Sequence, residues 1–357
     1  MKSERVLMKG NEALAEAAVR AGCRYFFGYP ITPQNEIPEY MSRRLPEVGG
    51  QFVQAESEVA AINMLYGAGG AGARAMTSSS SPGISLKQEG ISYMAAAEVP
   101  GLIVNMTRGG PGLGGIQPAQ SDYHQATRGG GHGDYRTIVF GPATVQEMVD
   151  LVGKAFDLAD RYRTPVVIVG DGMLGQMMEP VVLPDPVDPD RLPPKPWATT
   201  GARGRRPNLI NSLHLAAAEC EELNRRLQAK YSEIQAKEQM AEIVHPGADY
   251  FVVAYGTTAR ICREAVGQAR EEGLSIGLLR PITLWPFPTK AFEEVLETAK
   301  GFLTVEMSLG QMVDDVRLSV GGRAPVRFYG RTGGVVPSAE EVLGEIRRMV
   351  EEGDEGR

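Results

Sequence analysis

The chain alternates short, mostly apolar segments with longer segments in which apolar residues recur at helical spacing. Apolar runs of strand length occur at residues 24–27, 101–106 and 165–169. In residues 10–21 and 144–161, apolar residues recur every three to four positions. Strands that are apolar throughout are typical of a parallel sheet buried on both faces. The alternation therefore predicts an α/β fold in which helices cover both faces of a parallel sheet.

Proline density divides the chain. Prolines cluster between about residues 180 and 207, which predicts a linker, and we expect the charged stretch 208–244 to form one long helix. A second α/β unit begins near residue 250 and contains a proline-rich turn at 280–288. We therefore divide the chain into three parts, residues 1–184, 185–247 and 248–357. Further strands are expected at residues 51–54, 74–77, 275–279, 302–306 and 326–329, and further helices at 59–72, 84–97, 258–272 and 340–352 and from about 310.

Composition excludes several classes of protein. The formal net charge of −7 argues against a nucleic-acid-binding protein, which needs clustered basic residues for the phosphates. No apolar run approaches the roughly 20 residues that span a bilayer, and no signal peptide opens the chain. The three widely spaced cysteines predict a cytoplasmic protein without disulfides and exclude a four-cysteine iron–sulfur site within this chain.

Polar residues follow the predicted strands of the first unit. They are Thr32, Glu56 or Glu58, the serine run 78–81 and Arg108. Ligands of α/β proteins bind at the carboxyl ends of parallel strands, so we expect these groups at one edge. A carboxylate that opens an Ala/Gly-rich helix can exchange a proton with a ring nitrogen, and an arginine among glycines suits a carboxylate or phosphate. A simpler interpretation is that a glutamate in the first turn of this helix is exposed and only complements the helix dipole.

Two other motifs predict no metal site. Gly-Asp-Gly at 170–172 resembles the opening of a magnesium–diphosphate motif, but the next asparagine, Asn208, lies beyond the proline-rich linker. We interpret the triplet as a turn at the end of a strand. His124 and His132 have no spacing typical of zinc ligands, so we expect a hydrogen-bonded loop or a subunit contact there.

Several of these motifs together resemble the alpha subunit of 2-oxoacid:ferredoxin oxidoreductases. The motifs are Tyr-Pro-Ile-Thr-Pro at 29–33, Glu-Ser-Glu at 56–58, Ser-Pro-Gly at 81–83 and Thr-Arg-Gly-Gly-Pro at 107–111. Arg-Pro-Ile-Thr-Leu-Trp-Pro at 280–286 resembles the second domain of that family, so the resemblance covers nearly the whole chain. The Gln-Asn-Glu that follows Pro33 resembles the branched-chain type, which acts on 3-methyl-2-oxobutanoate.

The resemblance implies an enzyme that is divided between chains. Residues 1–184 would form a thiamine diphosphate domain of the pyrimidine-binding type, and residues 248–357 a transketolase carboxyl-terminal-like domain. A beta subunit would bind the diphosphate and Mg²⁺. A gamma subunit, a ferredoxin-like delta subunit, or both would carry the 4Fe-4S clusters that pass electrons to ferredoxin.

The resemblance also implies roles for particular residues. Glu58 is similar to the glutamate that hydrogen-bonds the pyrimidine ring, and its spacing to the Ser-Pro-Gly turn favours it over Glu56. Thr32 and Arg108 match residues that contact the oxo and carboxylate groups of the substrate. The cofactor-binding residues would be Tyr29, Pro30, Ile31, Thr32 and Glu58, and none would bind a metal.

The implied reaction is the oxidative decarboxylation of 3-methyl-2-oxobutanoate with CoA to acyl-CoA and CO₂, with reduction of ferredoxin. The same reaction on 2-oxoglutarate or pyruvate is an alternative, because Arg108 would serve any 2-oxo acid. A non-catalytic scaffold subunit with the same fold is a third hypothesis.

Overall fold

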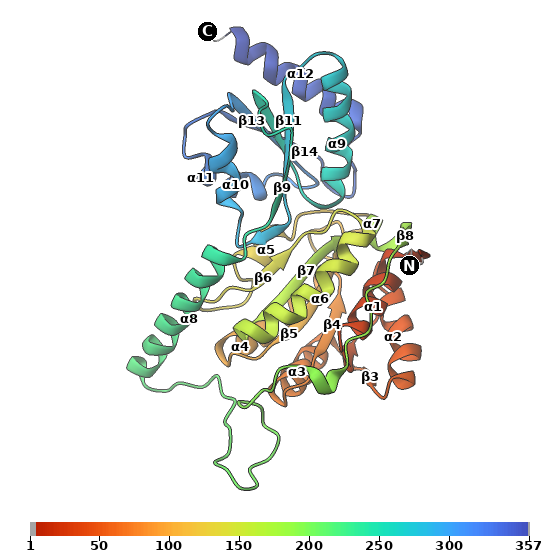
Figure 1. The fold of residues 1–357 in the computed structure, drawn as a ribbon, viewed down its shortest axis with the longest axis vertical. Coiled ribbons are helices and arrows are strands. Elements are labelled where there is room, and N and C mark those ends of the chain that lie inside the picture. The colour runs from red at the N-terminus through yellow and green to blue at the C-terminus, as the bar shows by residue number, and fades with distance from the viewer. Residues whose placement is uncertain (1–4, 356–357) are drawn as a thin grey trace.

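The computed structural model describes residues 5–355 and contains two large sheets, each covered by helices (Figure 1). The first sheet has the order β12-β6-β7-β5-β4-β2-β3, and its strands are parallel except β12, which pairs antiparallel with β6. Its strands are β2 Tyr25–Gly28, β3 Gln51–Gln54, β4 Ala75–Ser79, β5 Gly101–Thr107, β6 Ile138–Phe140, β7 Pro165–Asp171 and β12 Thr283–Trp285. The expected parallel sheet is thus confirmed, with one added antiparallel strand.

Helices cover both faces of this sheet (Figure 1). Helices α1 and α6 pack against each other with α2 beside α1, while α3 and α4 form the second layer. Glycine permits the close approach of α3 and α4, because a Cβ atom at Gly90 would lie 2.6 Å from the Ile62 side chain. The helices are α1 Gly10–Arg20, α2 Glu36–Glu47, α3 Glu58–Gly70, α4 Pro82–Ala96, α5 Tyr123–Thr127, α6 Val145–Tyr162 and α7 Gly172–Gln176.

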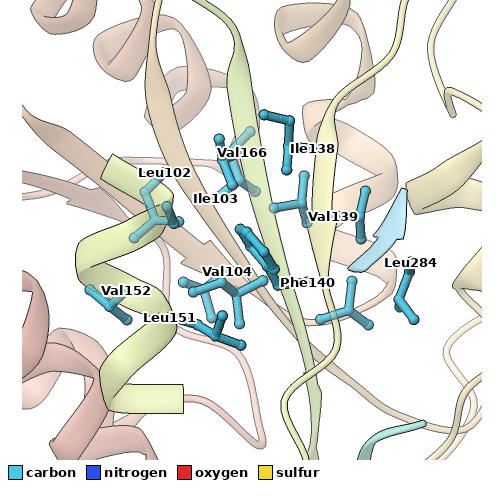
Figure 2. Packing of buried hydrophobic residues seen from close by; sticks show 14 of the residues in the cluster. Leu102, Ile103, Val104, Ile138, Val139, Phe140, Leu151, Val152, Val166 and Leu284 are labelled. Carbon is cyan, nitrogen blue, oxygen red and sulfur yellow. The ribbon is translucent and has the colours of Figure 1, made fainter. Parts of the chain in front are cut away.

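The core of the first unit lies along its central strands. All seven residues of β5 and all seven of β7 are buried, as apolar runs between two helical layers require. Figure 2 shows Val104 of β5 near Leu151 of α6, and Leu284 of β12 belongs to the same buried cluster as Phe140 of β6. The second half of the chain therefore contributes side chains to the core of the first sheet.

The second sheet has the order β14-β13-β10-β11-β9, and β9 runs antiparallel to β11. Its strands are β9 Ala241–Val244, β10 Tyr250–Val253, β11 Ile276–Pro281, β13 Gly301–Glu306 and β14 Val326–Gly330. The accompanying helices are α9 Gly256–Glu271, α10 Thr289–Val295, α11 Met312–Val320 and α12 Ala339–Glu355. A small antiparallel pair, β1 Val6–Lys9 with β8 Met178–Val181, and the 3₁₀ helix η1 Pro189–Arg191 complete the described elements.

Two sequence predictions are wrong. The expected helix 208–244 is shorter, α8 Ala217–Lys237, and is followed by strand β9. The chain turns there because the Met240 amide donates to Thr283 Oγ1 at 2.9 Å, which directs the next residues along β11. The predicted turn at 280–288 contains the end of β11 and all of β12, because residues 283–285 pair with the open edge of β6. The boundaries at 184/185 and 247/248 stay a prediction.

No helix among residues 5–355 is long and apolar enough to cross a membrane.

Candidate functional site

The carboxyl edge of the first sheet brings Arg108 and Thr32 together. Arg108 follows β5 and is 7% exposed, whereas Thr32 lies in the exposed turn after β2. Arg108 Nη1 donates to the Thr32 carbonyl at 2.9 Å, and Nη2 donates to the Leu113 carbonyl at 3.1 Å. The Nε atom is buried and has no hydrogen-bond partner within residues 5–355. A guanidinium has five donors, so Arg108 keeps donors for an anion while the backbone holds its orientation.

A buried polar network fixes Ser81 beside Arg108. The Ser81 hydroxyl donates to Asp122 Oδ2 at 2.7 Å and accepts from the Arg108 amide at 3.0 Å. Asn105 donates to the same carboxylate oxygen at 2.9 Å and accepts from the Ser81 amide at 3.0 Å. Burial raises the pKa of Asp122, and the hydrogen bonds from Ser81 and Asn105 oppose that rise. These contacts hold Ser81 at a φ of 21°, which a non-glycine residue rarely adopts.

An open cleft of about 680 Å³ adjoins this network. Both halves of the chain line it, since the loops after β4 and β5 face the loop after β13. Its lining comprises Ser81, Pro82, Ser85, Arg108, Gly109, Gly110, Pro111, Gly112, Ser121, Asp122, Leu309, Gln311 and Thr332. Arg108 is therefore a buried cation at the wall of a cleft large enough for a small organic acid.

Glu58 and Glu56 have opposite environments. Glu58 is the first residue of α3 and is 6% exposed, whereas Glu56 is exposed. Ser57 caps helix α3, because its side chain accepts from the Ala60 amide at 3.2 Å. That cap starts the helix at Glu58 and places its side chain under the neighbouring helix α4.

Glycine makes the room in which the Glu58 carboxylate lies. A Cβ atom at Gly83 would lie 2.7 Å from Glu58 Oε1 and would overlap the Ser79 hydroxyl. The hydroxyls of Ser79 and Ser80 are buried and have no hydrogen-bond partner within residues 5–355. The carboxylate of Glu58 also accepts no hydrogen bond within those residues. A buried acid beside buried hydroxyls without partners can form hydrogen bonds with the ring nitrogens of a heterocycle.

Sequence reasoning missed Lys87, which lies in α4 one turn after Gly83 and is fully buried. Its Nζ donates to Thr77 Oγ1 at 3.0 Å. Burial lowers the pKa of Lys87 to about 8, and the charge of Glu58 opposes that shift. No local signal predicts this burial, because a lysine in an amphipathic helix usually lies on the solvent side.

Sequence reasoning also gave no role to Gln34. It is fully buried, and its Nε2 donates to the Tyr29 carbonyl at 3.5 Å. Its Oε1 accepts from the Ser78 hydroxyl at 2.5 Å, so it ties the turn after β2 to the end of β4. Of the predicted cofactor-binding residues in that turn, Tyr29 and Pro30 are exposed and Ile31 is partly buried.

The predicted site residues form two clusters at this edge. Arg108 and Thr32 contact each other, and Glu58 lies beside Gly83. The segment 79–83 connects the clusters, because Ser81 contacts Arg108 while Gly83 contacts Glu58. The edge can therefore hold an anion at one end and a ring at the other.

The Gly-Asp-Gly triplet lies at the end of β7, as expected. Asp171 Oδ1 caps helix α7, accepting from the amides of Met173 at 2.9 Å and Leu174 at 3.1 Å. Burial raises the pKa of Asp171, and the hydrogen bonds from the Met173 and Leu174 amides oppose the rise. Among residues 5–355, no three His, Cys, Asp or Glu side chains lie close enough together to hold a metal ion.

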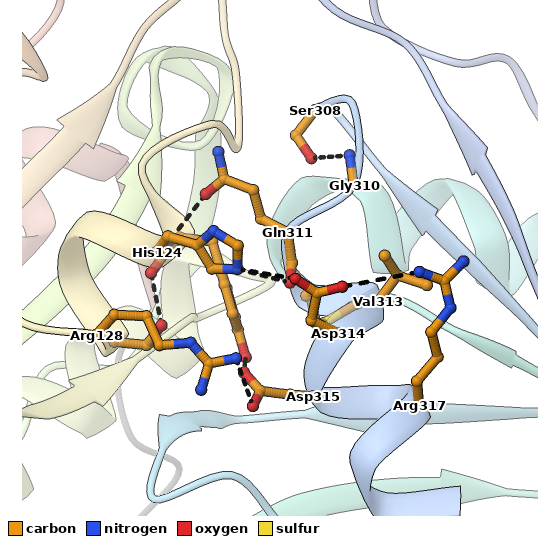
Figure 3. Close-up of polar contacts among 12 residues, drawn as sticks. His124, Arg128, Ser308, Gly310, Gln311, Val313, Asp314, Asp315 and Arg317 are labelled. Carbon is orange, nitrogen blue, oxygen red and sulfur yellow. Dashed lines mark hydrogen bonds and ion pairs between the residues drawn. The ribbon is translucent and has the colours of Figure 1, made fainter. Parts of the chain in front are cut away.

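His124 lies at the contact between the two halves of the chain, on α5 opposite α11 (Figure 3). Its amide donates to Gln311 Oε1 at 2.8 Å, and its Nε2 lies 3.1 Å from the Gln311 carbonyl oxygen. In the same contact, Arg128 lies 3.0 Å from Asp315, which also accepts from the Tyr123 hydroxyl at 2.6 Å. His124 is hydrogen-bonded as expected, but it lies in helix α5 and not in a loop, and the subunit contact stays a prediction.

Comparisons with known proteins agree on the kind of protein. The family model described as pyruvate flavodoxin/ferredoxin oxidoreductase, thiamine diphosphate-binding, matches residues 16–245. The model of the pyruvate:ferredoxin oxidoreductase core domain II matches residues 248–342. The chain is 50% identical to the ketoisovalerate oxidoreductase subunit VorB of Methanothermobacter thermautotrophicus, over 96% of this chain and 97% of that one. It is 37% identical to the 2-oxoglutarate synthase subunit KorA of the same organism, over 97% and 99%.

Solved structures show the same architecture. A 2-oxoglutarate:ferredoxin oxidoreductase from Magnetococcus marinus, with 2-oxoglutarate, coenzyme A and succinyl-CoA bound, has a TM-score of 0.85 and 27% identity. The match covers 97% of this chain and 65% of that one, so this chain spans slightly less than two thirds of that protein. A split-gene transketolase shares the fold at a TM-score of 0.57 and 13% identity, covering 96% and 97%.

Proposed function

Since the chain belongs to the pyruvate flavodoxin/ferredoxin oxidoreductase family, we propose that it is the alpha subunit of a 2-oxoacid:ferredoxin oxidoreductase that acts on 3-methyl-2-oxobutanoate. The reaction would convert this acid and CoA to acyl-CoA and CO₂ and reduce ferredoxin. The identity of 50% to a ketoisovalerate oxidoreductase subunit, against 37% to a 2-oxoglutarate synthase subunit, supports this substrate over 2-oxoglutarate. Competition between branched-chain, 2-oxoglutarate and pyruvate substrates in the assembled complex tests the choice.

The buried carboxylate of Glu58 carries the proposal for the cofactor. Bound thiamine diphosphate supplies the electron sink that decarboxylation of a 2-oxo acid requires. Glu58, whose carboxylate lies against Gly83, would hold a proton between its carboxylate and a pyrimidine nitrogen. The Ser79 hydroxyl, buried beside it, would orient the ring. Glu56, which is exposed, is not placed to exclude water from such a hydrogen bond.

Arg108 and Thr32 would bind the substrate at the cleft. Arg108 would orient the carboxylate of the 2-oxo acid with its remaining donors, while its two backbone hydrogen bonds keep the guanidinium from turning away. Thr32, in the exposed turn at the same edge, would contact the oxo group. Tyr29, Pro30 and Ile31 would form the wall of the cofactor site beside them.

The remaining parts of the reaction would come from other chains. In this proposal a beta subunit binds the diphosphate and Mg²⁺, which agrees with the use of Asp171 as a helix cap. A gamma subunit, a ferredoxin-like delta subunit, or both would carry 4Fe-4S clusters and reduce ferredoxin in the cytoplasm. The relatives are described as subunits, which supports an assembly of several chains.

Replacing Glu58 with glutamine in the assembled complex tests the proposed function. General acid–base groups contribute about 10²- to 10⁴-fold to rate, so we expect kcat to fall by at least about 100-fold. The matched control is Glu56→Gln, which removes an exposed carboxylate two residues away and leaves kcat within about twofold, as for most surface substitutions. If Glu58→Gln assembles and turns over at the wild-type rate, the catalytic assignment of Glu58 is wrong.

A further inference from the structure

Lys87 is a buried cation that neither the substrate site nor the core explains. It is fully buried in α4, and its Nζ forms a hydrogen bond to Thr77 Oγ1 at 3.0 Å. An ammonium has three donors, so a single neutral hydroxyl leaves most of its hydration uncompensated. A methionine would fill the same space without that cost.

The position of Lys87 indicates which acidic group balances the positive charge of its ammonium. Gly83 and Lys87 are four residues apart in α4 and therefore share one face of the helix. A Cβ atom added at Gly83 would lie 2.7 Å from Glu58 Oε1, so the Glu58 carboxylate lies against the part of α4 that precedes Lys87 by one turn. The charge of Glu58 opposes the lowered pKa of Lys87 without an ion pair of 4.0 Å or less between them. Burial of two opposite charges is tolerable when each neutralises the other.

We propose that Lys87 is a positioning residue for Glu58: its ammonium, anchored on Thr77, holds the Glu58 carboxylate in the space beside Gly83 and supplies its counter-charge. The inference rests on the proposed function, because Glu58 would use that position to meet the pyrimidine ring. Lys87 itself lies in the layer behind the carboxylate. It would act through Glu58 and would not touch the substrate.

The inference predicts how much more tightly the assembled complex binds thiamine diphosphate than an analogue of it. The probes are thiamine diphosphate and an analogue in which a carbon replaces the pyrimidine nitrogen that faces Glu58. In the wild type we expect tighter binding of thiamine diphosphate. Lys87→Met should lower the ratio of the two affinities by about tenfold, which corresponds to the loss of about one hydrogen bond to a charged group. Lys87→Arg keeps the charge and should retain most of the preference.

Lys230→Met is the matched control. Lys230 is a largely buried lysine in α8 that pairs with Glu98 at 3.1 Å, away from the cofactor edge. Lys230→Met should leave the cofactor preference unchanged. In the Glu58→Gln background, Lys87→Met should add no further loss of that preference, because Lys87 would act only through Glu58.

The outcomes separate the two proposals. If Glu58→Gln keeps the wild-type preference, the proposed function fails. If Glu58→Gln loses it but both Lys87→Met and Lys87→Gln keep it, only the inference about Lys87 fails. If neither Lys87→Met nor Lys87→Gln assembles, the pH dependence of the wild type tests the inference. Burial lowers the pKa of Lys87 to about 8, so the preference for thiamine diphosphate should fall between pH 7 and about pH 9.5 as the ammonium loses its charge. A preference that stays constant over this range would overturn the inference.

Discussion

At the scale of single residues, the site depends on where side chains are missing as much as on where they are present. Gly83 has no Cβ at the point where the Glu58 carboxylate lies, and the neighbouring Ser79 hydroxyl is buried without a partner. The motif Ser-Pro-Gly and Glu58 could be found in the sequence, but their packing against each other could not. Lys87 lies one turn after Gly83 and Gln34 two residues after Thr32, and only the packing of α4 and of the turn after β2 shows that both are buried.

Replacing Gly83 with alanine should disturb the site directly. The added methyl group would push against Glu58 Oε1 and the Ser79 hydroxyl, so we expect the free energy of unfolding to fall by about 1–3 kcal/mol. Affinity for thiamine diphosphate should fall with it. The control is Gly67→Ala in α3, where the Cβ meets nothing within 4 Å and helix propensity should raise stability by about 0.5–1 kcal/mol. Equal effects of the two substitutions would contradict the packing around Glu58.

At the scale of elements, the sequence predicted those helices and strands whose structure is set by residues close to them in the chain. Strand β3 has the predicted bounds, and α3 begins within one residue of the predicted start, because the Ser57 hydroxyl caps the amides of its own neighbours. Strand β12 and the end of α8 were mispredicted, because their structure comes from partners far away in the chain. Thr283 pairs with Phe140 of β6, and the Met240 amide bonds to Thr283.

The attachment of α8 to the first unit should depend on pH. Glu98 lies 3.1 Å from Lys230 and 3.2 Å from Arg226. Burial alone would raise the pKa of Glu98, but the two cations outweigh it and hold the pKa of this carboxyl below its usual range. A lowered pKa contributes stability that is present above pH 4.5 and is lost as the pH falls through the folded-state pKa.

We therefore expect Glu98→Gln to cost about 1–2 kcal/mol of unfolding free energy at pH 7 and much less near pH 3.5. Chemical denaturation of the wild type and the variant at both values measures the difference. A cost that does not change with pH would contradict the ionic attachment of α8.

At the scale of the whole molecule, the two halves are joined through both polar and apolar contacts. Arg280 of β11 donates twice to the Glu147 carboxylate of α6, at 2.8 and 2.9 Å, and once to Glu242 at 2.8 Å. Leu284 of β12 is fully buried in the core of the first sheet. Gln120 adds a buried link, since its Nε2 donates to the Tyr255 carbonyl at 2.9 Å. The cleft beside Arg108 therefore has walls from two halves that are held in one arrangement.

A double-mutant cycle measures how strongly this joint is coupled. Arg280→Met and Glu147→Gln each break the two-bond ion pair, whose side chains are 8% and 19% exposed. Each variant should destabilise the chain, and the coupling energy between them should be about 1–3 kcal/mol, as for residues in direct contact. Additive effects, with no coupling, would show that the pair does not hold the halves together.

The account as a whole depends on Glu58 meeting the pyrimidine ring of a cofactor whose diphosphate another chain binds. A density map of the assembled complex with thiamine diphosphate bound measures this directly. It should show a Glu58 carboxylate oxygen about 2.6–3.2 Å from a ring nitrogen, with the ring beside Gly83. A ring that contacts Glu56 instead, or a diphosphate held at Asp171, would contradict the account.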